Sequence, residues 1–429
     1  MKIWRIGEDK GERYLSKVEK RAGAVLSPAV EERVRKVVDA VARRGDRALV
    51  SFIRRFDLKG MEFADFRLRG TVGTPEELGE EFTGAVEMAI ANIKAFHEPQ
   101  VPKGYNLDRD GSDLAIRVRP LDSVGVYVPG GAAVYLSSLL MAVIPARLAG
   151  VKRIAVATPP RAFLSSPHLR YLLDRLDLRE VYLMGGAHAV AALAHGTEAV
   201  TAVDKVVGPG GKWVAAAKRA VYGVVDIDTI AGPSELVVVA DAHADPDVVA
   251  ADMLAQAEHD PDALAVLVTT SRTFADKAER RLAARLKATP KGAAVRQAIT
   301  RWGAILLARD LDEALAAVNR IAPEHVELLV DDPLRVLDGV ERAGAIYLGP
   351  WSPAVLGDYV VGVNHVLPTA GTARFGSPLG VWDFVRLTAV VRVCAHSYPR
   401  LDRAAGTLAL LEELPLHEAA LRAGTRGSR

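Results

Sequence analysis

Between Asp122 and Ser234, short runs rich in β-branched residues alternate with Ala- and Leu-rich segments of helical length. The runs expected to form strands are 124–128, 153–158, 180–183, 205–207 and 224–228. This alternation is typical of βαβ units, in which a helix connects each strand to the next parallel strand. The region therefore predicts a parallel sheet with helical crossovers.

The same alternation recurs further along the chain. The expected elements are strands over 236–240, 264–269 and 304–308, with helices over 247–258 and 272–288. Upstream, residues 28–56 and 75–97 carry apolar residues at helical spacing, with Gly45 a candidate break, and 115–120 alternates like a strand. Two Rossmann-like sheets are therefore expected.

After about Leu379 the sequence becomes mostly helical and charged, and this end of the chain is too short for a third α/β unit. The predicted fold class is α/β, with two Rossmann-like parallel-sheet domains, a helical N-terminal segment and a helical C-terminal arm. The expected limits are 1–24 for the N-terminal segment, 25–120 plus 236–378 for the first α/β domain, 121–235 for the second and 379–429 for the arm.

Length and composition narrow the class of protein. A chain of 429 residues exceeds the size at which one core keeps growing. The 55 basic and 53 acidic residues nearly balance, so the net charge does not indicate binding to nucleic acid. No apolar run approaches the roughly 20 residues that span a bilayer. The first twenty residues lack the apolar region of a secretory signal, and a single cysteine, Cys394, excludes an intrachain disulfide. A cytoplasmic protein that binds small molecules is expected.

One candidate metal-binding motif is Gln256-Ala-Glu258-His259, at the end of the expected helix over 247–258. Gln256 and His259 are three residues apart, so on a helix they share one face and are close enough to bind one ion. For this motif alone, a solvated or hydrogen-bonded pair is the more common explanation.

A second candidate site is the adjacent acid and imidazole of Glu324 and His325, which follow Pro323. An imidazole titrates near neutral pH and can accept a proton from an alcohol, while a neighbouring carboxylate can orient a water. The alternative is a capping glutamate beside a surface histidine.

Two further segments place acidic residues near histidines. Asp358 precedes His365 in a glycine-punctuated stretch, and Glu412 lies five residues before His417, with Pro415 interrupting any helix between them. Asp358 offers an oxygen ligand to a metal ion, and loops of this type often carry sites. Turn residues and a surface helix are the alternative interpretations.

These segments, in their order and spacing, resemble the histidinol dehydrogenase family over about residues 25–423. The likeness rests on VDKVVGPGGKWVAAAKRAVYGVVDIDTIAGPSELVVVAD, ADMLAQAEHDPDA, APEHVELL, LGDYVVGVNHVLPT and the terminal Glu-x4-His. A chance match of all five blocks in order is very improbable.

The resemblance implies an NAD-dependent, zinc-containing dehydrogenase that oxidises L-histidinol through L-histidinaldehyde to L-histidine, the last steps of histidine biosynthesis. By the resemblance, Glu324 and His325 are the catalytic acid and base. The implied zinc ligands are Gln256, His259, Asp358 and His417. The implied substrate contacts are Ser234, His325, His365, Glu412 and the four metal ligands. Nitrogen and oxygen ligands without thiolate suit zinc, and zinc has no redox chemistry, so hydride must leave on a nicotinamide.

The cofactor site departs from common patterns. No G-x-G-x-x-G motif follows a strand, but Tyr127, before a glycine pair, matches a cofactor-contacting tyrosine of the family. His188 and Gly211 stand where the family usually has Gln and Asn. These two replacements remove side-chain amides that contact the cofactor in the family, although His188 can still donate a hydrogen bond.

The charged tail is too small for a core of its own and must dock elsewhere. With the resemblance, this favours a homodimer with shared active sites, in which one chain supplies Glu412 and His417 to the other. Two alternatives stay open: a dehydrogenase of the same family that acts on another small alcohol, and a zinc hydrolase that uses Glu324 without a nicotinamide.

Overall fold

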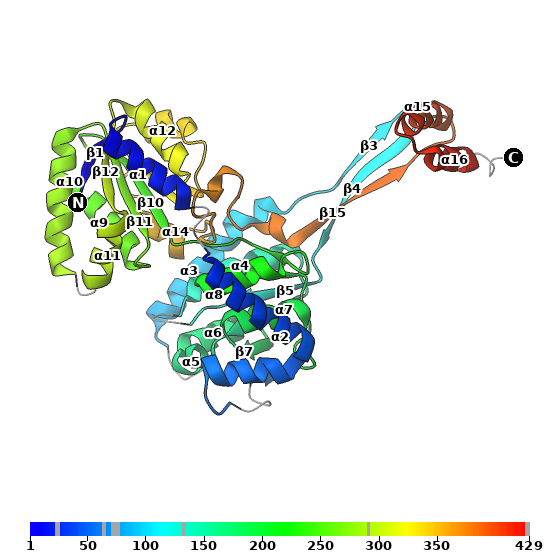
Figure 1. The fold of residues 1–429 in the computed structure, drawn as a ribbon, viewed down its shortest axis with the longest axis horizontal. Coiled ribbons are helices and arrows are strands. Elements are labelled where there is room, and N and C mark those ends of the chain that lie inside the picture. The colour runs from blue at the N-terminus through cyan, green and yellow to red at the C-terminus, as the bar shows by residue number, and fades with distance from the viewer. Residues whose placement is uncertain (22–25, 62–65, 70–77, 131–133, 290–291, 425–429) are drawn as a thin grey trace. The chain divides into compact units, whose positions relative to one another are not determined.

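The structure is a computed structural model that describes residues 1–21, 26–61, 66–69, 78–130, 134–289 and 292–424. The chain divides into two compact units, each built from two stretches of sequence. Unit 1 comprises Met1–Gln100 and Leu121–Phe384, and unit 2 comprises Val101–Pro120 and Val385–Arg429. Figure 1 labels their helices and strands.

The first sheet of unit 1 has six parallel strands in the order β1-β12-β11-β10-β13-β14. Its strands are β1 (Ile3–Arg5), β10 (Glu235–Ala240), β11 (Leu264–Thr269), β12 (Ala304–Leu307), β13 (His325–Leu329) and β14 (Ala345–Leu348). The accompanying helices are α1 (Asp9–Glu19), α9 (Pro246–Glu258), α10 (Arg272–Ala288), α11 (Gly292–Trp302), α12 (Leu311–Ile321), α13 (Pro333–Val336), η5 (Leu337–Gly339), α14 (Ala354–Tyr359) and η6 (Thr372–Arg374). The short helix η7 (Val381–Phe384) packs instead on α4 (Leu136–Ala149), a helix of the second sheet.

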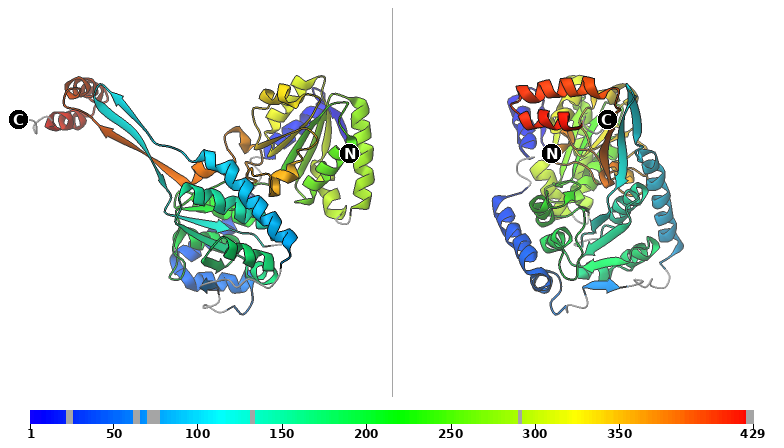
Figure 2. Two further views of the ribbon diagram at one scale, coloured as in Figure 1. Left: turned by 180° about the vertical axis from the view of Figure 1, so that it is seen from behind. Right: turned by 90° about the vertical axis from the view of Figure 1, so that its right-hand side faces the viewer.

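Helices cover both faces of this sheet, because successive strand residues point to opposite sides. On β10, Val238 packs in a core with α9, α10 and α11, while Val237 packs in a separate core with α1 and α12. This arrangement explains why the strands read as continuous apolar runs. The helices on the two sides are visible in Figure 1 and Figure 2.

The second sheet of unit 1 has the order β2-β7-β6-β5-β8-β9, and only β2 at its edge is antiparallel to its neighbour. Its strands are β2 (Arg67–Arg69), β5 (Ser123–Tyr127), β6 (Arg153–Thr158), β7 (Glu180–Leu183), β8 (Lys205–Val207) and β9 (Asp226–Ile227). Its helices are α2 (Pro28–Phe52), η2 (Ile53–Asp57), α3 (Glu80–His97), η4 (Glu98–Gln100), α4 (Leu136–Ala149), α5 (Pro160–Ser165), α6 (Pro167–Arg175), α7 (Gly186–His195) and α8 (Lys212–Val221).

Unit 2 is an antiparallel sheet in the order β15-β4-β3 with two helices. Its elements are β3 (Tyr105–Arg109), β4 (Ser112–Pro120), β15 (Val385–Arg392), α15 (Tyr398–Leu411) and α16 (Pro415–Gly424). Ser112 and Ser397 join their hydroxyls at 2.6 Å and so tie the sheet to the start of α15. Most of β15 and all of β3 are exposed in this chain.

The α/β class and the two Rossmann-like sheets predicted from the alternation are confirmed, and α2 has a non-helical break at Gly45, whose φ is +52°. The strand pairing differs from the expected grouping of residues. The N-terminal segment contains β1, which pairs with β12, and the arm begins with β15, which pairs with β4. Within the expected range 25–120, α2 and β2 belong with the second sheet rather than the first, since α2 packs on α7 and α8 and β2 pairs with β7. Residues 101–120 belong to unit 2.

These differences arise from contacts between segments far apart in the sequence, which local patterns do not encode. As domain limits we propose the sheets themselves: β1 and α1 with β10–β14, α2–α3 with β5–β9, and unit 2. Across the residues that the structure describes, no helix combines the length and the apolar character needed to cross a bilayer.

Candidate active site

Glu324 and His325 lie at the amino end of β13, and both are buried, with 6% and 4% of their surface exposed. Leu236 of β10 pairs with His325, so the start of β10 lies directly beside them. The backbone of Glu235 contacts both side chains: its N–H donates to Glu324 Oε2 at 2.9 Å, and its carbonyl oxygen is 3.0 Å from His325 Nδ1. The alternative of a capping glutamate beside a surface histidine is therefore wrong.

These contacts fix the tautomer of His325. A carbonyl oxygen can only accept, so Nδ1 must carry the proton, and in the neutral ring Nε2 is then a free acceptor. Nε2 is buried without a hydrogen-bond partner and lies 3.8 Å from Asp358 Oδ1. The imidazole thus presents an unpaired base to the site that contains Asp358.

Burial shifts the pKa values of both His325 and Glu324 away from their usual ranges. It lowers the pKa of His325, so the ring is neutral at pH 7 and able to accept a proton. It raises the pKa of Glu324 to about 8, and the negative charge of Asp358 contributes in the same direction. Hydrogen bonds from the Glu235 backbone and from the Ser234 side chain act against this rise. A cation bound beside Asp358 would offset that charge and favour ionised Glu324.

Three predicted metal ligands lie near this pair. Gln256 is in the last turn of α9, His259 follows as its C-cap, and Asp358 belongs to α14. His259 Nε2 and Asp358 Oδ2 are 4.0 Å apart, and two atoms each about 2.1 Å from one zinc ion are at most about 4.2 Å apart. Gln256 Nε2 is buried without a hydrogen-bond partner. The spacing is within the reach of one shared ion, and a flip of the unpaired Gln256 amide would present its oxygen as a further ligand.

His365 and Ser234, predicted to contact substrate, also reach this group. His365 Nδ1 lies 2.8 Å from the carbonyl oxygen of Asp358, and its Nε2 lies 3.0 Å from the hydroxyl of Ser138 on α4. Ser234 hydrogen-bonds to Glu324. Asp358 and His365, for which the alternative was a role as turn residues, thus both belong to this group.

Sequence reasoning missed Ser138 and Glu235. A serine within an apolar helix carries no recognisable signal, and Glu235 acts through its backbone, which any residue type could provide.

Glu412 and His417 belong to unit 2. Glu412 is the C-cap of α15 and His417 lies in the first turns of α16, so Pro415 does separate two helices as expected. Both side chains are exposed in this chain. Their predicted roles stay predictions.

The three predicted cofactor residues lie at the carboxyl ends of strands in the second sheet, the edge at which α/β proteins bind nucleotides. Tyr127 ends β5, and its hydroxyl accepts from the N–H of Gly186 at 3.0 Å. His188 is in α7, and its Nε2 lies 2.8 Å from Asp57 Oδ2. Gly211 is the N-cap of α8, with open space where a side chain would lie.

The loop before α8 is held by buried charges. Gly208 has a φ of +115°, and a Cβ there would overlap the carbonyl oxygen of Tyr127. Its N–H donates to Asp228 at 2.8 Å, and its carbonyl oxygen accepts from Lys218 at 3.0 Å. Lys218 and Asp228 also form a buried ion pair. The glycine stretch 208–211 is thus fixed as a rigid turn.

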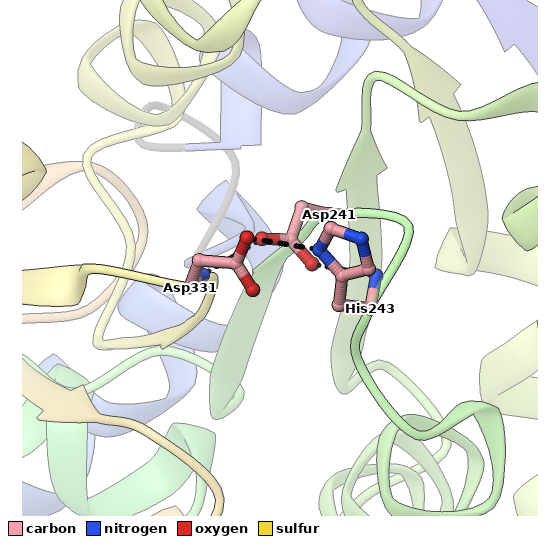
Figure 3. Close-up of side chains that lie close together, drawn as sticks. All are labelled: Asp241, His243 and Asp331. Carbon is pink, nitrogen blue, oxygen red and sulfur yellow. Dashed lines mark hydrogen bonds and ion pairs between the residues drawn. The ribbon is translucent and has the colours of Figure 1, made fainter.

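A separate group of Asp241, His243 and Asp331 lies beyond the opposite, carboxyl ends of β10 and β13 (Figure 3). Asp241 accepts backbone N–H bonds from His243 at 2.8 Å and from Asp331 at 2.7 Å, and His243 lies 2.9 Å from the Asp331 carboxylate. His243 and Asp331 are exposed. These contacts join two surface loops, and the sequence reasoning did not single them out.

Comparison with known proteins identifies the family. A family model described as histidinol dehydrogenase matches residues 20–424. The chain is 42% identical to the histidinol dehydrogenase of Bacillus cereus over 414 residues, which cover 95% of each chain, and 44% identical to that of Rhizobium meliloti over 401 residues, 91% of each. The crystal structure of histidinol dehydrogenase from Elizabethkingia anophelis superposes with a TM-score of 0.89 at 29% identity, covering 100% of this chain and 98% of that one. The chain therefore belongs to the histidinol dehydrogenase family, which are oxidoreductases of histidine biosynthesis.

Proposed function

We propose that the chain oxidises L-histidinol to L-histidine through L-histidinaldehyde, with two molecules of NAD and at a zinc site. The observation that carries this proposal is the state of His325. Its Nδ1 is bound to the Glu235 carbonyl, and its unpaired Nε2 faces Asp358, between the acid Glu324 and the candidate ligands. A base in this position suits an alcohol held beside Asp358.

Zinc, when bound, would supply a Lewis acid that grips and orients the nitrogen groups of the substrate. The residues that would hold it are Gln256, His259, Asp358 and His417. The buried amide of Gln256 and the 4.0 Å spacing of His259 and Asp358 support this set.

NAD, when bound, would accept a hydride in each of the two oxidations. His325 takes the proton of the substrate hydroxyl at Nε2 in the first oxidation, which gives the aldehyde, and then passes this proton to solvent. Glu324 and His325 next take a proton from the water that adds to the aldehyde, and they take the hydroxyl proton of the hydrated aldehyde in the second oxidation, which gives the carboxylate. Because both side chains are buried, the aldehyde is shielded from bulk water while it is held.

Further residues would bind the substrate and the cofactor. We assign Ser234, His365 and Glu412 to the substrate, where the Glu412 carboxylate would offset the positive charge of its amino group. We assign Tyr127, His188 and Gly211 to NAD, at the carboxyl edge of the second sheet. His188 binds Asp57 through Nε2, so Nδ1 is the nitrogen left for the cofactor.

The enzyme is expected to reduce NAD when histidinol is added, and to form histidine with two NADH for each histidinol consumed. Absorbance of the reduced nicotinamide and chromatography of the product measure this. A zinc hydrolase would leave the nicotinamide absorbance unchanged. A dehydrogenase of another small alcohol would show turnover with other alcohols at a far higher kcat/KM than with histidinol.

We further propose a cytoplasmic homodimer with shared active sites. A single cysteine leaves no intrachain disulfide to maintain, which agrees with a reducing compartment. Unit 1 exposes large apolar side chains around a cavity of about 650 Å³, among them Trp351, which is 91% exposed, and Trp382. Exposed apolar surface of this kind marks interaction sites. The occupant we propose is a second copy of the chain, whose His417 would complete the ligand set.

Co-expression of two inactive variants tests the sharing. In a mixed dimer of His417→Ala and His259→Ala, sharing in trans places both lesions in one site and neither in the other, so about half of the activity of a wild-type dimer should return in that species. The matched control pairs His259→Ala with Asp358→Ala, which leaves one lesion in each site and should restore nothing. Inactive mixed dimers in the first pairing would show that each site is built from one chain.

A further inference from the structure

Two carboxyl groups that the proposed chemistry does not use are hydrogen-bonded to each other behind the candidate metal ligands. Asp252 lies on α9, and Glu327 lies on β13 with only 1% of its surface exposed. Both lie within sequence blocks that carry the family resemblance, but no role is assigned to either. Isolated carboxylates are rarely buried together, so the pair needs a physical reason.

A hydrogen bond between two carboxyl groups requires that one of them carries a proton. Two ionised carboxylates have only acceptors, and Glu327 Oε2 would then have no donor among the residues that the structure describes. Burial, together with the negative charge of Asp252, raises the pKa of Glu327 to about 8. The pKa of Asp252 also rises on burial, to about 6. At neutral pH one proton therefore joins the two groups.

The pair connects three elements that carry site residues. Asp252 is four residues before Gln256, so both lie on one face of α9. Glu327 is two residues after His325, so both side chains leave β13 on the same side. Glu327 Oε1 accepts from the N–H of Ala354 at 2.8 Å, the first residue of the helix α14 that contains Asp358.

We propose that Asp252 and Glu327 are positioning residues for the metal site, which hold α9 and α14 against β13 so that Gln256, His259 and Asp358 converge on one ion. This inference rests on the proposed zinc site. The hydrogen bond from Asp252 ties α9 to Glu327, and the N–H of Ala354 ties α14 to the same carboxyl group; an apolar contact of similar volume would not be directional in this way.

Two substitutions at Asp252 separate positioning from simple packing. Asp252→Asn keeps the shape and supplies a permanent donor to the Glu327 carboxylate, whereas Asp252→Ala removes the hydrogen bond. Alanine has the highest helix propensity, and Asp252 is only partly buried, so the Ala variant should fold. Glu327→Gln is the mirror variant, since its amide can donate to Asp252 while its oxygen still accepts from Ala354.

The readout is binding of Co²⁺ to the metal-free protein, followed by its ligand-field absorption and by competition with a chelator. We expect Asp252→Ala to weaken Co²⁺ binding by about 10–100-fold and to alter the absorption, because partners behind metal ligands have effects of this size. Asp252→Asn and Glu327→Gln should stay within about 3-fold of the wild type. Thermal unfolding of each metal-free variant serves as the folding control.

The Co²⁺ measurement distinguishes failure of the positioning role from failure of the proposed zinc site. If Asp252→Ala binds Co²⁺ as the wild type does while His259→Ala does not, the site stands and the positioning role is overturned. If His259→Ala binds like the wild type, or the wild type binds no Co²⁺, both proposals are overturned. Equal weakening in Asp252→Asn and Asp252→Ala would also overturn the role of the hydrogen bond.

Discussion

Removal of the bound divalent ion is expected to lower the rate of histidinol oxidation by at least about 10³-fold, because a Lewis acid contributes several kcal/mol and each 1.4 kcal/mol is tenfold. Zinc added in stoichiometric amount should restore the rate. The measurement is NADH formation before dialysis against a chelator, after it, and after addition of zinc, with metal analysis at each stage. Fully active protein without a divalent ion would contradict the proposed site.

The chain itself offers a matched control for this prediction. His259→Ala should abolish both activity and tight metal binding, since His259 is a proposed ligand 4.0 Å from Asp358. His243→Ala, in the exposed group with Asp241 and Asp331, should leave both unchanged. The reverse pattern would place the essential ion at the opposite edge of the first sheet.

Replacement of His325 by alanine is expected to lower kcat for the first oxidation by about 10²–10⁴-fold, the range that a positioned general base contributes. Metal content should not change, because His325 lies outside the proposed ligand set. Single-turnover formation of NADH from histidinol measures the first step, and metal analysis of the purified variant measures retention. Loss of the metal together with activity would make His325 a ligand instead of a base.

Glu324→Gln separates the two oxidation steps. The amide keeps the volume and can still accept from the Glu235 N–H, but it cannot take a proton from water. With histidinaldehyde as the substrate the rate should fall strongly, whereas the first hydride transfer from histidinol should fall much less. Equal slowing of both half-reactions would count against a role in water activation.

The repeated alternation of strands and helices could be predicted from the sequence alone, because each strand and helix has its own hydrophobic periodicity. The strand at 264–269 and the helix that ends at Glu258 follow from apolar spacing. The catalytic pair also had a local signal, an acid beside an imidazole after Pro323. No local sequence signal indicated that this pair is buried. Glu and His are usually surface residues, and here they are buried only because the folded chain encloses them.

Contacts between distant segments could not be predicted in this way. The backbone of Glu235 organises Glu324 and His325 across about ninety positions of sequence, and no side-chain motif marks a backbone contact. The hydrogen bond between Asp252 and Glu327 depends on α9 packing over the face of the first sheet from which Glu327 projects. The strand β4 was indicated by alternating apolar and polar residues. Its partner β15 lies in a segment whose sequence is typical of a charged helix.

The pairing of β1 with β12 also has a consequence for synthesis of the chain. Ile3–Arg5 is translated before its partner Ala304–Leu307, which follows about 300 residues later. At translation speeds of roughly 5–20 residues per second, this strand and the apolar face of α1 wait on the order of 15–60 s for the rest of their sheet. An unpaired strand with an uncovered apolar neighbour invites pairing with other chains. This interval ends only when the chain has been made as far as Leu307, the end of β12.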